Sequence, residues 1–333
     1  MKLLKIFKIS AIPVLLIIFF PVNTFLSAKE TPEKNVDNKV SEGYEYSFNG
    51  TVKLPVNVYD TFEFSGNAKP YLRVFTYASG PTFMLVYGAG LWQWFEDVHF
   101  NLKTETYKGA HSINGAADKY GHLWGNYMGK RLFTFLFRST GSSGIRANIE
   151  GAILMDITSL GGELGDGISP NYGFDPYDVL FNQFGIIIAM ILDYSPFLDR
   201  IFAPKWEYWP SSYQRKRFGD PSNWDIATDY SDEKFILTTK LGGIPYLSLS
   251  PLRYFNIDVG YYSRGYRPAL LYNSRTRNVF LGVSVNFTIA FGDLLPVGYT
   301  SSTTQTFFNY YHPPWDYEAK VWELSNEPHS EFE

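Results

Sequence analysis

One short segment in the middle of the chain combines an acid, a base, an imidazole and an amide. It reads GAADKYGHLWGNY and contains Asp118, Lys119, His122 and Asn126. Residues 118, 122 and 126 are spaced by four, and residues with this spacing lie on one face of a helix. The pattern therefore predicts a polar helix face that could take part in chemistry.

Two further segments could complete this polar face. Glu163 and Asp166 occur in GGELGDGIS, and Asp178 and Asn182 are one helical turn apart in DPYDVLFNQFG. If the three segments pack together, we expect their carboxylate, imidazole and amide groups to converge in a small polar centre.

Three kinds of chemistry are compatible with such a centre. Imidazole and carboxylates bind Zn, Mn or Fe, and the candidate ligands are His122, Asp118, Glu163 and Asp166. Alternatively, His122 oriented by Asp118 could act as a general acid or base. The third interpretation is a buried hydrogen-bond network in which Lys119 neutralises a carboxylate. A set with one histidine and no cysteine is a poor metal site, so the network is favoured and no cofactor is expected.

Helices must position these residues. Residues 115–138 contain no proline, and Gly121, Gly125 and Gly129 recur every four residues. Glycine costs about 1 kcal/mol in a helix interior, so we expect these glycines to let a second helix approach closely. A second helix is predicted over residues 145–160. A third is predicted to begin at Asp175, with Asp175 as N-cap and proline at the next position.

Strand-like alternation flanks the helical middle. From Tyr44 to about Tyr87, apolar and polar residues alternate, which predicts strands with one buried face. Alternation returns over residues 255–262 and 279–292. The second of these runs suits a lipid-facing barrel strand, and equally a soluble sheet packed on helices. The aromatic and basic stretch from Trp206 to Arg217 resembles either a membrane-interface belt or a solvated loop.

Composition limits the class of protein. The 333 residues include 61 aromatics (18%) and only 19% charged residues, whereas soluble domains carry about 25% charged residues. This aromatic-rich composition argues against disorder. The net charge of −4 lacks the basic footprint of nucleic-acid binding, so nucleic acid is not expected as a partner.

The first residues resemble an export signal. Basic residues, an apolar stretch and a small residue at Ala28 predict a Sec-type signal peptide, and an uncleaved anchor is the alternative. Because the chain has no cysteine, it has neither disulfides nor a residue that could carry a lipid. We therefore expect export to the periplasm or outer membrane of a Gram-negative-type bacterium.

These patterns divide the chain into six parts. The expected boundaries are a signal peptide (1–28), a flexible linker (29–43), a β-rich segment (44–91), a helical region (92–204), an antiparallel β-rich region (205–295) and an aromatic, acidic tail (296–333). The tail includes His312, to which the sequence assigns no role, and is expected to be loosely held.

The helical motifs resemble a known family. GAADKYGHLWGNYMGKR, GELGDGIS and YGFDPYDVLFNQFG are similar to the DK-x-x-H, E-x-x-D and G-F-S-x-x-D-x-x-x-N-x-x-G pattern of YfiM-type predicted periplasmic lipoproteins, and more distantly to VanZ-like membrane proteins. The resemblance covers about residues 110–195. The matching positions are Asp118, Lys119, His122, Glu163, Asp166, Gly173, Phe174, Asp178, Asn182 and Gly185. The sequence departs from the pattern at Asp175, where serine is usual, and in having no lipid-bearing cysteine.

Together these features predict an α+β fold with a core of about three helices and antiparallel β structure on both sides of it in sequence. An outer-membrane β-barrel with a helical insertion is the alternative architecture. The resemblance implies an uncharacterised envelope protein, for which we expect a structural or binding role with outer-membrane or envelope components as partners. A metal-dependent or acid/base hydrolase acting on lipid or cell-wall material is the alternative function.

Overall fold

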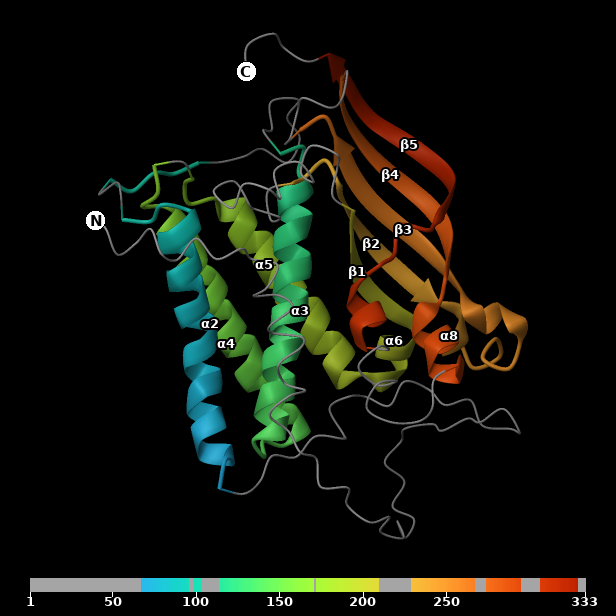
Figure 1. Ribbon diagram of the computed structural model, residues 1–333, viewed down its shortest axis with the longest axis horizontal. Coiled ribbons are helices and arrows are strands. Elements are labelled where there is room, and N and C mark those ends of the chain that lie inside the picture. The colour runs from blue at the N-terminus through green and yellow to red at the C-terminus, as the bar shows by residue number, and fades with distance from the viewer. Residues whose placement is uncertain are drawn as a thin grey trace.

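The computed structural model describes residues 67–95, 99–103, 114–170, 172–209, 229–266, 274–294 and 306–328. It confirms an α+β fold in which helices and a sheet lie side by side (Figure 1). The helices are α2 (Lys69–Leu91), α3 (Ala117–Ser139), α4 (Gly144–Asp166), α5 (Pro176–Tyr194), α6 (Pro196–Ile201) and α8 (Phe287–Leu294). The strands are β1 (Phe202–Tyr208), β2 (Glu233–Lys240), β3 (Phe255–Arg264), β4 (Ser274–Val285) and β5 (Tyr317–Pro328). The expected signal peptide and linker lie outside the described residues.

Helix α3 is the centre of the helical part. It packs against α2, α4 and α5 and also touches β1, β2 and β3, so it lies between the other long helices and the sheet (Figure 1). None of its residues is exposed. The helix that carries the first polar segment is therefore largely covered by other elements.

The predicted starts and ends of the helices follow local signals. Asp175 caps α5 by accepting a hydrogen bond from the backbone N of Tyr177, and Pro176 is the first helical residue. This cap is the one predicted from sequence. Ser195 caps α6 in the same way, through Leu198 N, with Pro196 following it. Helix α4 contains the second predicted helix and extends it at its end.

The five strands form one antiparallel sheet in sequence order, β1-β2-β3-β4-β5. Lys234 of β2 forms an ion pair with Glu318 of β5 across two intervening strands, so the sheet curves around the face that carries Lys234. We call this the inner face and its opposite the outer face. The described strands form an open sheet with β1 and β5 as edges, so they do not form the barrel given as the alternative architecture.

The outer face of the sheet meets the helices at one side only. Phe235 and Tyr261 of the sheet stack on Tyr120 of α3, and Trp206 packs against Trp124. Trp206 was predicted to lie in a membrane-interface belt or in a solvated loop. This prediction is wrong, because Trp206 lies in the contact between the sheet and α3. Tyr213 and the basic residues after it lie outside the described residues.

Four expectations from the alternation and composition are corrected. Residues 69–91, expected to be β-rich, form α2, because this segment packs along α4 and tertiary context overrides its β-favouring residues. The strand expected over residues 279–292 ends at Val285, because Asn286 accepts a hydrogen bond from Ile289 N and starts α8. Strand β1 begins at Phe202, inside the region expected to be helical up to 204, and continues beyond it. The expected tail supplies β5, which pairs with β4 along its length.

The glycines that permit close helix packing are not those predicted. A Cβ on Gly185 of α5 would fall against the carbonyl oxygen of Leu123 in α3, and one on Gly151 of α4 would meet Thr134. Of the predicted stripe, Gly129 faces Met155 of α4, but Gly121 faces the sheet and a Cβ on Gly125 would meet nothing within 4 Å. The stripe as a single packing surface is therefore wrong, and the close approach depends on glycines of the neighbouring helices.

Candidate polar centre

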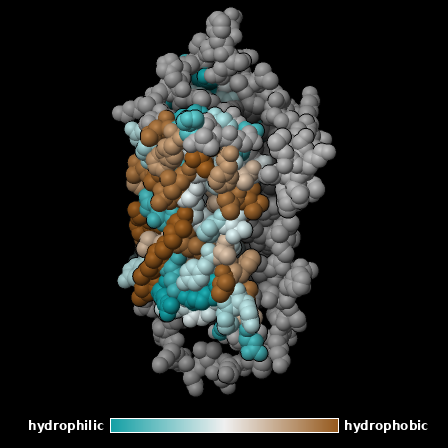
Figure 2. Space-filling model, turned by 90° about the vertical axis from the view of Figure 1, so that its left-hand side faces the viewer, coloured by the Kyte–Doolittle hydropathy of each residue, from teal (hydrophilic) through white to brown (hydrophobic). Residues whose placement is uncertain are grey.

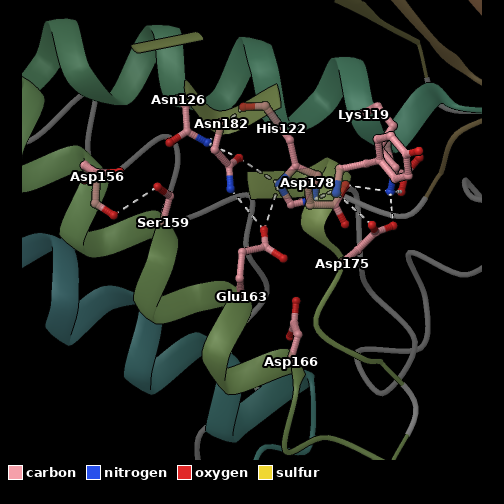
Figure 3. A network of polar contacts seen from close by, with 12 residues as sticks. Lys119, His122, Asn126, Asp156, Ser159, Glu163, Asp166, Asp175, Asp178 and Asn182 are labelled. Atoms are coloured by element: carbon pink, nitrogen blue, oxygen red, sulfur yellow. Dashed lines mark hydrogen bonds and ion pairs between the residues drawn. The ribbon is translucent and has the colours of Figure 1, made fainter. Parts of the chain in front are cut away.

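Lys119 is the cationic hub of the polar centre (Figure 3). Its side chain is 1% exposed, and Nζ lies 2.6 Å from Asp178 Oδ1, 2.8 Å from Asp175 Oδ2 and 3.1 Å from Asp118 Oδ2. One ammonium group thus faces three carboxylates from α3 and the start of α5. Burial of a charge is unfavourable unless it is paired, and here each carboxylate depends on the same lysine.

His122 joins the centre one turn further along α3. Its Nδ1 lies 3.0 Å from Asn182 Oδ1 and 3.4 Å from Glu163 Oε1, and its Nε2 lies 3.6 Å from Asp178 Oδ1. The Asn182 amide donates to Glu163 Oε1 at 3.0 Å. Three helices therefore meet through this imidazole and this amide, as the sequence predicted.

Asn126 completes the α3 contribution. Its Nδ2 donates to Asn182 Oδ1 at 2.5 Å and to the backbone oxygen of His122 at 2.9 Å. Because Asn182 Oδ1 accepts from Asn126, and His122 Nδ1 lies at the same oxygen, that nitrogen is best assigned as the protonated one. The other ring nitrogen, Nε2, then faces Asp178.

Two residues differ from the prediction. Asp166 is near the centre, but Figure 3 draws no hydrogen bond or ion pair from it to the other residues shown; its Oδ1 instead accepts from Trp94 Nε1 at 2.8 Å. Asp175 was predicted only as a helix cap, yet its second oxygen also binds Lys119. Its place three residues before Asp178 is the sequence signal that could have revealed this second role.

The geometry limits what this centre can do. His122, Glu163 and Asp178 each offer a ligand atom, and these atoms lie within 4.8 Å of one another, so the three side chains could hold a metal ion. Asp178 Oδ1 is already 2.6 Å from Lys119 Nζ, however, and a cation there would compete with the ammonium group. His122 is 32% exposed, which leaves its imidazole accessible for proton exchange. The most complete set of partners is that of a structural network.

A second ionic cluster lies further along α3. Lys130 Nζ is 2.7 Å from Asp193 Oδ2, and Arg131 binds both Asp193, through Nε at 3.0 Å, and Asp199, through Nη1 at 2.5 Å. Lys130 and Arg131 are buried. This cluster was not predicted from the sequence, and the adjacent cations midway along the helix were the available signal.

A third polar cluster lies on the inner face of the sheet. His312 Nδ1 lies 2.9 Å from Glu207 Oε2, and its Nε2 lies 3.6 Å from Asp258 Oδ2. Thr238 donates to Asp258 at 2.7 Å. His312 and Asp258 are buried, so the histidine assigned no role in the tail is in fact part of the interior. The polar positions of the alternating strands were the signal for this cluster.

Comparison with known families concerns the helical part. A family model described as "Predicted periplasmic lipoprotein (DUF2279)" matches residues 104–194. This segment of the chain is similar to that family. The matched segment contains α3, α4 and α5 and every residue of the centre, and it covers less than half of the chain. No curated protein and no solved structure matches the chain.

The match agrees with part of the resemblance found in the sequence. It supports a periplasmic protein family of unknown function and an exported, periplasmic location. The finer likeness to YfiM-type and VanZ-like proteins stays a prediction. The family description includes a lipid anchor, but the 333 residues contain no cysteine to carry one.

Proposed function

We propose that the protein is a non-enzymatic component of the cell envelope, with a structural or binding role associated with the outer membrane. The observation that carries this proposal is the distribution of polarity in the helical part. The buried helix α3 bears Lys119, Lys130 and Arg131, whereas, apart from Arg146, the exposed large side chains of α4 and α5 are apolar or aromatic. A water-soluble protein normally shows the opposite arrangement.

In this proposal the polar centre holds α3, α4 and α5 together. Its hydrogen bonds and ion pairs have defined partners on all three helices, and such networks fix the relative positions of packed elements. The exposed apolar side chains supply the contact with the envelope, because contiguous apolar surface of this kind marks interaction sites.

Fractionation tests the location. The full chain would be expressed in a Gram-negative host, and the inner and outer membranes separated by density. We expect the protein to sediment with the outer membrane and to resist a wash with alkaline carbonate. Recovery wholly in the soluble periplasmic fraction would contradict the proposal, and a carbonate-released protein would limit it to peripheral association.

A second candidate function is a metal-dependent or acid/base hydrolase acting on lipid or cell-wall material. The specific observation is the proximity of His122, Glu163 and Asp178. Elemental analysis of the purified protein and of the His122→Ala variant distinguishes the two functions. Stoichiometric metal that is lost in the variant would favour the hydrolase. No bound metal, together with reduced stability of the variant, is the result expected for a structural network.

A further inference from the structure

The exposed faces of the long helices are almost wholly apolar. Every exposed residue of α5 is apolar or aromatic, and beyond Arg146 the exposed residues of α4 are isoleucine, leucine and glycine. On α2, Thr82 is the one exposed residue that is neither apolar nor aromatic. Figure 2 views the side of the molecule on which α2 and α4 lie, and apolar side chains gather over much of it.

The lengths of these faces approach the thickness of a lipid bilayer. Beyond Arg146, the exposed apolar stripe of α4 runs from Ile149 to Leu164, a rise of about 23 Å at 1.5 Å per residue. That of α5 runs from Tyr177 to Tyr194, about 26 Å by the same rise. The hydrocarbon core of a bilayer is about 30 Å thick. Exposed tyrosines at both ends of the α5 stripe are typical of residues at the two membrane interfaces.

The sheet, like the helical part, has polar residues on its buried face and apolar residues on its exposed face. On its inner face, Thr238, Asn256 and Asp258 are fully buried, whereas the outer face exposes apolar residues of β2, β3 and β4. The register places Leu237, Val259 and Leu281 side by side, and Ile257 beside Val283. Away from the contact with α3, this outer face has no protein cover among the described residues. An apolar exterior around a polar interior is also the pattern of strands in membrane-embedded barrels.

The mean hydropathy of each helix does not reveal these apolar outer faces. Among the described helices, only α5 is long and apolar enough to cross a membrane by length and composition, and core helices pass the same test. The charges of α3 and α4 lower their average hydropathy, but those of α3 lie inside the bundle and those of α4 beyond Glu150 point inward. In a membrane protein, ionisable residues of this kind face the interior of the bundle and pair with one another.

We infer that the outer faces of α2, α4 and α5 and the outer face of the sheet contact lipid hydrocarbon, so that the protein is integral to the membrane. This inference rests on the proposed membrane association and goes further, because it commits both parts of the molecule to lipid. A partner protein is the less fitting occupant, since it would have to cover the helical side and the sheet side together. A bilayer surrounds both without specific contacts.

Spin labelling tests the inference cleanly because the chain has no native cysteine. Single cysteines would replace Ile153 and Ile187 on the helices and Val259 and Val283 on the sheet, all exposed. Asn326, exposed at the polar end of β5, is the matched control. The labelled full-length protein would be reconstituted in phosphatidylethanolamine–phosphatidylglycerol vesicles, and collision rates with oxygen and with a water-soluble nickel chelate measured.

We expect the oxygen-to-nickel collision ratio to be several-fold higher at the four apolar sites than at Asn326. High nickel accessibility at all four sites, in a protein that still fractionates with membranes, would overturn the inference and leave peripheral association in place. Lipid contact of the helical labels alone would overturn it for the sheet. Low accessibility to both reagents would mean that another copy of the chain covers these sites, and would overturn the inference. A protein that does not bind vesicles or membranes at all would overturn the proposed function itself.

Discussion

Lys119 is the residue on which the polar centre depends most. It compensates three aspartates at once, and its own side chain is buried. Removal of one partner of a buried ion pair leaves an uncompensated charge, which is more costly than the pair is favourable. Because the Lys119 ammonium group pairs with all three aspartates, the centre can hold these carboxylates in a small volume.

Replacement of Lys119 by methionine tests this dependence. The methionine keeps the volume of the side chain and removes its charge, so we expect Lys119→Met to lower the free energy of unfolding by about 3–5 kcal/mol. Thermal unfolding in detergent, followed by circular dichroism, measures the change. The control is Arg146→Met, which removes a solvent-exposed cation paired with Glu150 and should leave the unfolding midpoint nearly unchanged. Equal effects of the two substitutions would contradict a special role of Lys119.

Asp229, between β1 and β2, gives the stability a pH dependence. Burial, followed by the charge of Asp232, raises the pKa of Asp229 to about 8, against about 4 for an ordinary aspartate. Between these values the folded protein keeps a proton that the unfolded chain has lost, so stability falls as the pH rises. Below pH 4 the folded and the unfolded states both hold the proton, so Asp229 no longer makes the stability depend on pH.

We therefore expect Asp229→Asn to flatten the decline in stability between pH 5 and pH 8. The substitution keeps an oxygen that can accept the hydrogen bond from Tyr208, 3.0 Å away, and it cannot ionise. Unfolding midpoints of the two proteins in detergent, measured across this pH range, give the difference. Parallel pH profiles would show that Asp229 titrates normally.

At the scale of elements, the fold depends on how closely α5 and α4 approach α3. Gly185 and Gly151 permit these approaches, whereas Gly125 lies on α3 where a side chain would meet no other atom. Helices packed through small residues bring their polar side chains within hydrogen-bond distance. The polar centre is thus assembled by backbone proximity as well as by its own contacts.

The two glycines give a matched pair of substitutions. Gly185→Ala forces a Cβ against the Leu123 carbonyl, and we expect a loss of about 1–3 kcal/mol, as for other overpacked interiors. Gly125→Ala adds a methyl group in open space and should be neutral or stabilising by up to about 1 kcal/mol, because alanine favours helix. Chemical or thermal unfolding of both variants measures the difference. A destabilised Gly125→Ala beside a stable Gly185→Ala would reverse the assignment of the packing surface.

At the scale of the whole molecule, the arrangement is a charged interior inside an apolar exterior. Three polar clusters, around Lys119, around Lys130 with Arg131, and around His312, lie inside the helical part and on the inner face of the sheet. Beyond Arg146, the exposed side chains of α4 and α5 are apolar or aromatic, and so are those that β2, β3 and β4 expose on the outer face of the sheet. In water this arrangement exposes apolar area that would favour association, whereas in lipid it is the expected one.

Charged substitutions on the outer faces distinguish contact with lipid from contact with water. We expect Ile153→Lys on α4 and Val259→Lys on β3 each to reduce the protein recovered in the membrane several-fold, since lysine near a bilayer midplane costs about 2–4 kcal/mol. Quantitative blotting of membrane and soluble fractions measures the recovery, with Arg146→Lys as a control that keeps the charge. Unchanged membrane recovery and improved solubility of the lysine variants would be the behaviour of a water-exposed surface.

Much of the helical part could be predicted from sequence because its signals are local. The spacing of Asp118, His122 and Asn126, the Asp175–Pro176 start and the proline-free segments depend on near neighbours in the chain, and the structure confirms these helices. Alternation likewise predicted β3 and most of β4. Residues 69–91 were assigned wrongly because packing against α4, which is not local, decides their conformation.

The order of residues shows that apolar and polar residues alternate along the strands and that acids, an imidazole and amides recur on the helices. It does not show which side of each element is inside. A period of two or of four residues defines two faces but does not tell which face is buried. A lipid-facing sheet and a soluble sheet therefore share the same sequence pattern. Only the tertiary structure, which places Asp258 under the sheet and Val259 outside it, decided that the polar faces are buried.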